Sequence, residues 1–105
     1  MSEIEETLER IKNHSGVEGY IIMNNAGEVL RKLPSMSTVK AKEYGDEVYK
    51  LSKKAAHVVR DLDPKDHLLY FRIRTREREL MVAPGGDYIV VIVQKWRPSD
   101  WGESK

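Results

Sequence analysis

The longest periodic pattern in this 105-residue chain occupies residues 38–62, TVKAKEYGDEVYKLSKKAAHVVRDL. Apolar residues recur there at alternating steps of three and four, the spacing of one stripe along an α-helix. The stripe contains Ala41, Tyr44, Val48, Leu51, Ala55, Val58 and Leu62, and it is widened on one flank by Tyr49, Ala56 and Val59. The sequence therefore predicts a long helix whose apolar face is broad enough to contact two surfaces.

Both ends of this helix carry boundary signals. Pro34 and the Ser35-Met36-Ser37-Thr38 cluster predict a loop and supply candidate N-cap residues. Asp63-Pro64 ends the helix, because the residue before a proline avoids helical backbone angles.

Short apolar runs on either side of the helix predict strands. On the amino-terminal side, a strand at 20–23, an Asn-Asn-Ala-Gly turn at 24–27 and a return strand at 28–32 form a hairpin. On the carboxyl-terminal side we expect strands at 68–74, 79–83 and 88–94, separated by a charged turn at 75–78 and by Pro-Gly-Gly-Asp at 84–87.

A second, shorter helix is expected at residues 3–13. Ser2 and Glu5 have the capping-box spacing, and Ile4, Leu8 and Ile11 follow at helical intervals. Residues 89–93 are apolar on both faces, as expected of a central strand covered on both sides. The element order therefore predicts a three-layer α/β sandwich with one mostly antiparallel five-stranded sheet.

Composition limits the class of protein. The chain has 18 Lys+Arg and 17 Asp+Glu, a formal charge of +1 that does not favour nucleic acid as partner. Without cysteine it has no disulfide, thiol nucleophile or Cys-ligated zinc, which favours the cytosol. The longest apolar run, 88–93, is far shorter than the roughly 20 residues that span a bilayer, so no membrane segment is expected. We predict one domain at 2–95 and a surface or flexible tail at 96–105.

We expect no catalytic site, cofactor or metal. The acidic residues Asp61, Asp63 and Asp66 lie close to His67, but they have no recognised metal spacing and are interpreted as helix-end and loop residues. The glycines at 84–87 lack the Lys-Ser/Thr of a phosphate loop and indicate a hairpin turn.

Four arginines alternate along the chain at Arg72, Arg74, Arg76 and Arg78. On a continuous strand they would share one face and form a basic stripe for an acidic stretch of a protein partner. Because Glu77 and Glu79 lie in the same stretch, a mixed-charge turn is the favoured interpretation.

Several motifs resemble the roadblock family of dynein light chains over residues 2–94. They are Val59-Arg60-Asp61-Leu62-Asp63-Pro64, Phe71-Arg72-Ile73-Arg74, Leu80-Met81-Val82-Ala83-Pro84 with Asp87-Tyr88, the amino-terminal run 3–11, and Gly16-Val17-Glu18-Gly19. The resemblance implies a non-enzymatic homodimer whose long helices pack together and whose third strands pair into a ten-stranded sheet. It further implies that the dimer binds the dynein intermediate chain, in the cytoplasm and cytoskeleton. Modules of this fold also act as scaffolds for small GTPases, which is the alternative function.

The resemblance also assigns roles to residues. The expected dimer contacts are Tyr44, Val48, Leu51, Ala55 and Val58 in the helix and Tyr70, Arg72 and Arg74 in the strand. An unpaired strand at 68–74 would otherwise be an exposed template for aggregation. Ile4, Leu8 and Ile11 are candidate partner contacts, although they can equally pack on the sheet. Residues 28–34 and the tail depart from the family pattern, which favours a paralogue specialised for axonemal dynein in a cilium, or one pairing with a second roadblock light chain.

Overall fold

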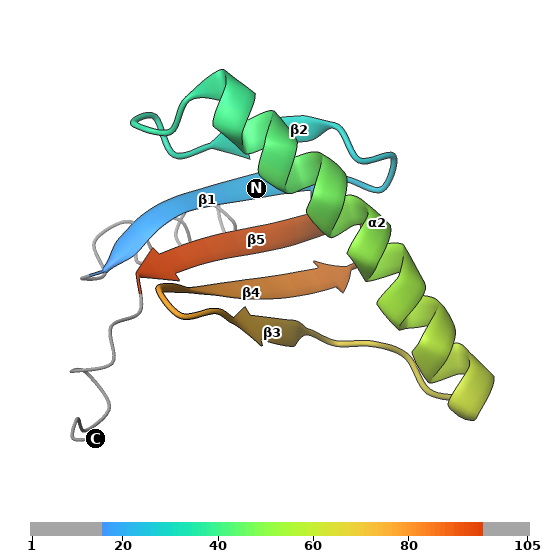
Figure 1. The fold of residues 1–105 in the computed structure, drawn as a ribbon. Helices are drawn as coiled ribbons and strands as arrows, with labels where there is room; N and C mark the ends of the chain where they lie inside the picture. The colour runs from blue at the N-terminus through green and yellow to red at the C-terminus, as the bar shows by residue number, and fades with distance from the viewer. Residues whose placement is uncertain (1–15, 96–105) are drawn as a thin grey trace, which may run out of the picture.

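A computed structural model describes residues 16–95 as one antiparallel sheet crossed by one long helix (Figure 1). The strands lie in the order β2-β1-β5-β4-β3, so β2 and β3 form the two edges. The bounds are β1 (Val17–Asn24), β2 (Val29–Lys32), α2 (Thr38–Leu62), β3 (Phe71–Arg74), β4 (Arg78–Gly85) and β5 (Tyr88–Lys95). The five-stranded antiparallel prediction is confirmed. The helix predicted at 3–13 and the tail at 96–105 lie outside the described residues.

The long helix has the predicted bounds. At its start, the Ser37 side chain accepts a hydrogen bond from the Lys40 backbone N–H at 3.0 Å. At its end, the Asp63 backbone N–H donates to the Val59 carbonyl at 3.0 Å, and Pro64 follows. The predicted boundary signals therefore act locally: Ser37 caps the start of the helix, and Asp63-Pro64 ends it.

The β1–β2 turn is held by side chains as well as by backbone. Asn24 Oδ1 accepts from the backbone N–H groups of Ala26 and Glu28, at 2.9 and 3.0 Å. Gly27 has φ +88°, and a Cβ there would lie 3.0 Å from the Tyr49 ring. The turn therefore needs glycine both for its left-handed backbone and for its close approach to α2.

The strand β3 is shorter than predicted, beginning at Phe71 and not at residue 68. Phe71 pairs with Val82 of β4, so continuing this register would place Leu69 opposite Pro84. Proline has no backbone N–H to donate, and the ladder stops before that position.

Three other strands are longer than predicted. β1 begins at Val17, through a bulge between Val17 and Gly19, and it pairs with β5 along its whole length. β4 extends over Arg78–Gly85, and β5 reaches Lys95. Polar residues and glycine at the strand ends hid these extensions, since backbone pairing requires no apolar side chain.

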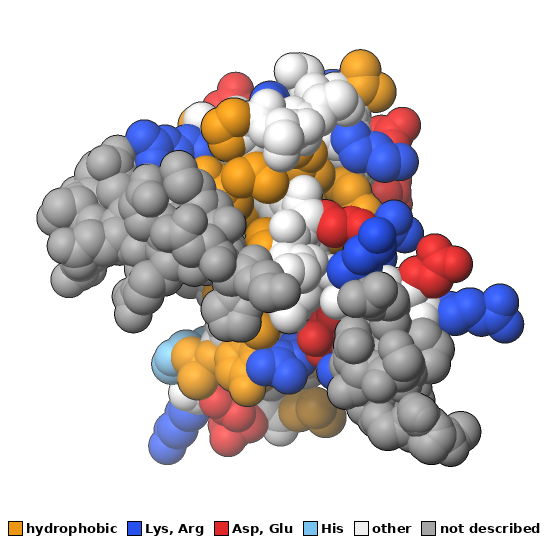
Figure 2. All heavy atoms as spheres, turned by 90° about the vertical axis from the view of Figure 1, so that its left-hand side faces the viewer, with side chains coloured by type: hydrophobic (Ala, Val, Ile, Leu, Met, Phe, Trp, Pro, Cys, Tyr) orange, Lys and Arg blue, Asp and Glu red, His pale blue; other side chains and the backbone are white. Residues whose placement is uncertain are grey.

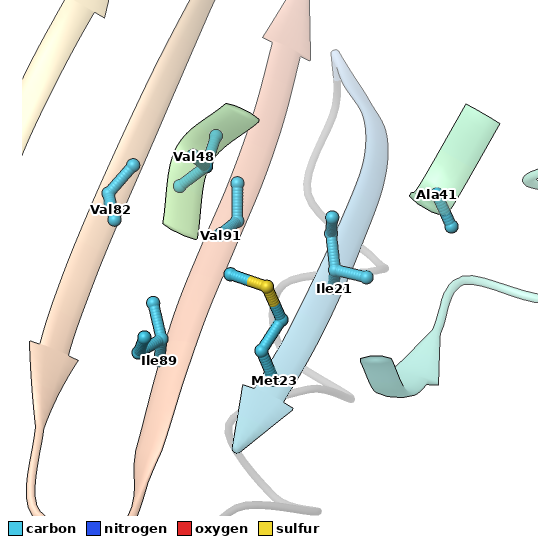
Figure 3. Packing of buried hydrophobic residues seen from close by; sticks show 7 residues of the cluster. All are labelled: Ile21, Met23, Ala41, Val48, Val82, Ile89 and Val91. Carbon is cyan, nitrogen blue, oxygen red and sulfur yellow. The ribbon is translucent and has the colours of Figure 1, made fainter. Parts of the chain in front are cut away.

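The main core lies between α2 and the sheet (Figure 3). It consists of Ile21 and Met23 from β1, Val82 from β4, Ile89 and Val91 from β5, and Ala41 and Val48 from α2. On the opposite face of the sheet, Tyr20 and Ile22 are also buried, with Leu33, Tyr88 and Val90 packed against them. Both faces of the central strands are thus apolar, as predicted.

α2 touches the sheet mainly through its first half. The buried residues of α2 are Ala41, Gly45, Val48 and Ser52. A Cβ at Gly45 would lie 3.1 Å from Val29 Cγ2, so glycine allows the helix to approach β2 closely. Beyond Ser52 no α2 residue is buried, and Figure 1 shows this end of the helix extending past the β3 edge.

Replacing either of two serines by alanine should change the stability of the protein in opposite directions: Ser52, which lies in α2, and Ser37, which caps it. Ser52 is 2% exposed and its Oγ has no hydrogen-bond partner within the described chain, whereas Ser37 caps the helix. We expect Ser52→Ala to raise the free energy of unfolding by about 1 kcal/mol in total. Of this, roughly 0.5 kcal/mol comes from the higher helix propensity of alanine, and the rest comes from removing a buried hydroxyl without a partner. Ser37→Ala should lower it by about 1 kcal/mol. Urea titration followed by circular dichroism measures both; an unchanged or lower value for Ser52→Ala would show that the hydroxyl is satisfied in solution.

Candidate protein-binding surface

The second half of α2 exposes a row of apolar side chains. Leu51 is 41% exposed, Val58 47% and Leu62 82%, and Ala55 between them is partly exposed. At 100° per residue this row lies about 60° around the helix from the sheet-facing row of Ala41 and Val48. The helix therefore has one apolar row against its own sheet and a second row facing outward.

The connection from α2 to β3 adds to this outward row. Leu69 and Tyr70, which directly precede β3, are also large, apolar and exposed. We define the α2–β3 surface as Leu51, Ala55, Val58, Leu62, Leu69 and Tyr70. An apolar surface of this kind along one helix and an adjacent strand edge is typical of protein contacts.

A groove opens between α2 and the outer strands. It has a volume of about 420 Å³ and apolar walls formed by Tyr44, Leu51, Ile73 and Leu80. Its rim carries Lys40, Glu43 and Glu47, of which Lys40 and Glu43 form an exposed ion pair at 3.7 Å. The groove thus has an apolar floor and a charged rim. Protein interfaces have the same arrangement, with an apolar centre that loses its water and a polar rim.

β3 is an edge strand, and no other strand within residues 16–95 pairs with its outer side. The Thr75 backbone N–H donates to the Arg78 carbonyl at 2.8 Å, and ladder bonds alternate along antiparallel strands. The backbone groups of Arg72 therefore point away from β4. On the face opposite α2, Arg74 Nη2 and Arg72 Nη1 lie 3.1 and 3.9 Å from Glu79 Oε2.

The structure places most of the predicted interface residues at or near this surface. Leu51, Ala55, Val58, Tyr70, Arg72 and Arg74 keep exposed area, and Tyr44 is half-buried. Val48 is different, because it is 4% exposed and packs in the main core (Figure 3). Its side chain has almost no area left for a second molecule. Leu62 and Leu69 were missed as contact candidates, although both lie in apolar patterns of the sequence.

The alternating arginines do not form one stripe. A turn at Thr75–Glu77 separates them, and Arg78 lies on the α2 face of the sheet, where its Nε donates to Glu18 Oε1 at 2.8 Å. This hydrogen bond and the Glu18 charge raise the pKa of Arg78 above its ordinary value. Figure 2 shows Lys and Arg side chains interleaved with Asp and Glu on this side of the molecule. The mixed-charge interpretation is confirmed for this turn.

The acidic residues near the helix end make local contacts. Asp63 Oδ1 accepts from the Lys65 backbone N–H at 3.0 Å, and Asp66 Oδ1 accepts from that of His67 at 2.9 Å. Within residues 16–95 no group of three His, Cys, Asp or Glu side chains is placed to hold a metal ion. In the same part of the chain no helix is long and apolar enough to cross a membrane. Ile4, Leu8 and Ile11 lie outside the described residues.

Comparison with known sequence families gives a match that covers most of the chain. The Roadblock/LC7 domain matches residues 3–95. This chain belongs to the Roadblock/LC7 family. The resemblance inferred from the sequence motifs is therefore confirmed at the level of the family, and the dynein light chain assignment within it is not.

Solved structures share the roadblock fold at low sequence identity. A Roadblock/LC7 domain from Streptomyces avermitilis has a TM-score of 0.73 and 8% identity, covering 81% of this chain and 71% of its own. MglB from Myxococcus xanthus has a TM-score of 0.73 and 7% identity, with coverages of 90% and 77%. The gliding protein MglB from Thermus thermophilus has a TM-score of 0.72 and 15% identity, with coverages of 90% and 72%. At such identities the likeness concerns the fold.

Val48 and Leu51 should respond differently to truncation because one is core and the other surface. Val48→Ala should lower the free energy of unfolding by about 2 kcal/mol at any protein concentration, since it leaves a cavity against the sheet. Leu51→Ala should lower the free energy of unfolding by less than about 1 kcal/mol at low protein concentration. Urea titrations at two protein concentrations tenfold apart test both. Equal losses for the two variants in dilute protein would contradict the assignment of Leu51 to the surface.

Proposed function

We propose that this roadblock chain is a non-catalytic adaptor that dimerises through the α2–β3 surface and holds a protein partner. The carrying observation is the exposed apolar row of α2 together with β3, an edge strand of the sheet formed by residues 16–95. Several large apolar side chains are exposed to water on one side of this small domain. Covering them with a second molecule removes apolar surface from water, which lowers the free energy and favours association.

A twofold axis beside β3 satisfies both parts of this surface. Pairing β3 with its copy extends the five strands to ten and uses the outward backbone of Arg72. The same axis brings the outward rows of the two α2 helices together, with Leu51 and Val58 at the seam. Support also comes from the groove beside Tyr44 and Leu80, which a second apolar side chain can fill.

For the partner, the first candidate is a small GTPase on which the dimer acts as a scaffold. The solved structures described above are a Roadblock/LC7 domain and two MglB proteins. None of the three is named as a dynein light chain, and they therefore favour this role over a dynein role. The mixed charge of the described surface favours a folded protein partner over nucleic acid, since phosphate backbones require a field of positive charge.

The second candidate is the dynein intermediate chain, in a cytoplasmic or axonemal motor. This candidate is supported by the position of two motifs that resemble those of the dynein light chains. Residues Val59–Pro64 contain the end of α2, and Phe71-Arg72-Ile73-Arg74 forms the whole of β3. The residues that resemble the dynein light chains thus border the proposed dimer seam. Under this candidate the protein would work in the cytoplasm and cytoskeleton, or in a cilium.

Affinity capture separates the two partners. The tagged full-length chain, bound to resin, is incubated with cell extract containing GTP or GDP. Under the first candidate a small GTPase is recovered, with a several-fold difference between the two nucleotides. Under the second, dynein intermediate and heavy chains are recovered equally with either nucleotide. Recovery of neither class by the dimer would contradict the adaptor proposal.

Charge placed in the helix seam should separate the subunits. Leu51→Asp and Val58→Asp should each weaken dimerisation by about 100-fold or more, because an unpaired carboxylate would be buried among apolar side chains. Lys50→Asp is the control, since Lys50 is exposed about a quarter-turn or more from this row. Light scattering coupled to gel filtration gives the mass. A wild-type monomer at high concentration, or dimers in all four proteins, would contradict the interface.

A further inference from the structure

β2 forms the edge of the sheet farthest from β3. It comprises only Val29–Lys32 and pairs with β1 on one side. The Leu33 backbone N–H donates to the Tyr20 carbonyl at 3.1 Å, so by alternation along the ladder the backbone groups of Lys32 point away from β1. A donor and an acceptor are therefore directed outward at the end of this edge.

A groove runs along β2 beneath the first half of α2. It has a volume of about 610 Å³ and extends along residues 26–32 of the hairpin. Its apolar lining includes Val29, Leu30 and Ala41, and Leu30 is 50% exposed. The groove thus follows an edge strand for several residues, which matches the shape of an extended chain better than that of a compact ligand.

The charged side chains of the groove lining are three basic residues, Arg31, Lys32 and Lys42, against two acidic ones, Glu28 and Asp46. Asp46 Oδ2 pairs with Lys42 Nζ at 3.2 Å, whereas Glu28 Oε1 accepts from the neutral Asn24 amide at 2.7 Å and keeps its charge. Lys32 Nζ donates to the Met36 carbonyl at 2.7 Å, and no carboxylate of residues 16–95 forms an ion pair with it.

The start of α2 adds to this positive charge. Thr38, in the first turn of α2, lines the groove, and this turn contains no acidic residue. Helix amino termini carry partial positive charge, which acidic side chains commonly balance. Here that charge and the Lys32 ammonium lie at the same end of the groove without such a balance from the described residues.

We propose that the β2 groove binds an extended, acidic segment of a partner protein, which adds to the sheet as a strand beside β2. Its backbone would pair with Lys32, an apolar side chain would cover the exposed part of Leu30, and a carboxylate would lie near Lys32 and the start of α2. A second copy of this chain is a poorer occupant, because it would bring the same positive end to the groove.

This inference does not depend on the proposed function. β2 and β3 are opposite edges of one sheet, so a dimer formed through β3 keeps its β2 grooves accessible. A ten-stranded dimer would offer two such grooves, and a partner with two acidic segments would gain affinity from binding both.

The test uses a phage library of random 12-residue peptides selected on the full-length chain. Enriched peptides should combine Asp or Glu with β-branched residues. Their affinity should fall by about tenfold in Lys42→Glu, which reverses a charge in the groove. Lys50→Glu is the matched control, because Lys42 and Lys50 are both exposed α2 lysines paired with an acidic neighbour, at 3.2 and 3.3 Å. Hydrogen exchange should show new protection at the Lys32 amide when a peptide is bound.

Four results would overturn the proposal. The first is enrichment of peptides with no acidic bias; the second is an equal loss of affinity in the two lysine variants whose urea midpoints match that of the wild type. The third is protection confined to β3 and the end of α2, which would instead place the peptide on the α2–β3 surface. The fourth is a concentration-dependent mass that persists in Leu51→Asp and is lost in Lys42→Glu, which would show a second copy in the groove.

Discussion

The close contact between the first half of α2 and the sheet determines the rest of this structure. Gly45 lets the helix lie against Val29, and Ala41 and Val48 then pack on β1, β4 and β5. A helix held at one end by small residues and crossing the strands diagonally cannot keep its other end on the same sheet (Figure 1). The outward apolar row of Leu51, Val58 and Leu62 is a consequence of this crossing.

The same contact creates two grooves on opposite sides of the helix. Toward β3, α2 and the outer strands enclose an apolar groove with Ile73 and Leu80 at its floor. Toward β2, the helix start and the hairpin enclose a groove with a basic end. The two proposals assign a symmetrical, largely apolar partner to the first side and an extended, acidic partner to the second. Under both proposals, one small domain would connect several chains through the two edges of its sheet.

Both edge strands of the sheet formed by residues 16–95 are short. β2 and β3 contain four residues each, whereas β1, β4 and β5 contain eight. Short edge strands limit indiscriminate pairing, since few backbone groups are offered at once. Pro84, which lies beyond the β3 ladder, and the bulge between β1 and β2 keep these edges short.

Local patterns in the sequence were sufficient to determine the long helix, the β1–β2 hairpin and the order of the strands along the chain, whereas the pairing of β1 with β5 was visible only in the sheet. Caps, turn glycines and apolar periodicity act within a few residues, so their effects are visible without a fold. Periodicity also identified the broad apolar face of α2, yet it could not assign each residue of that face to the core or to the surface. Val48 and Leu51 are neighbours on the helix, and only the crossing angle of α2 buries the first and exposes the second. The β2 groove and the pairing of Arg78 with Glu18 likewise join residues far apart in the chain, so they existed only once the strands had come together.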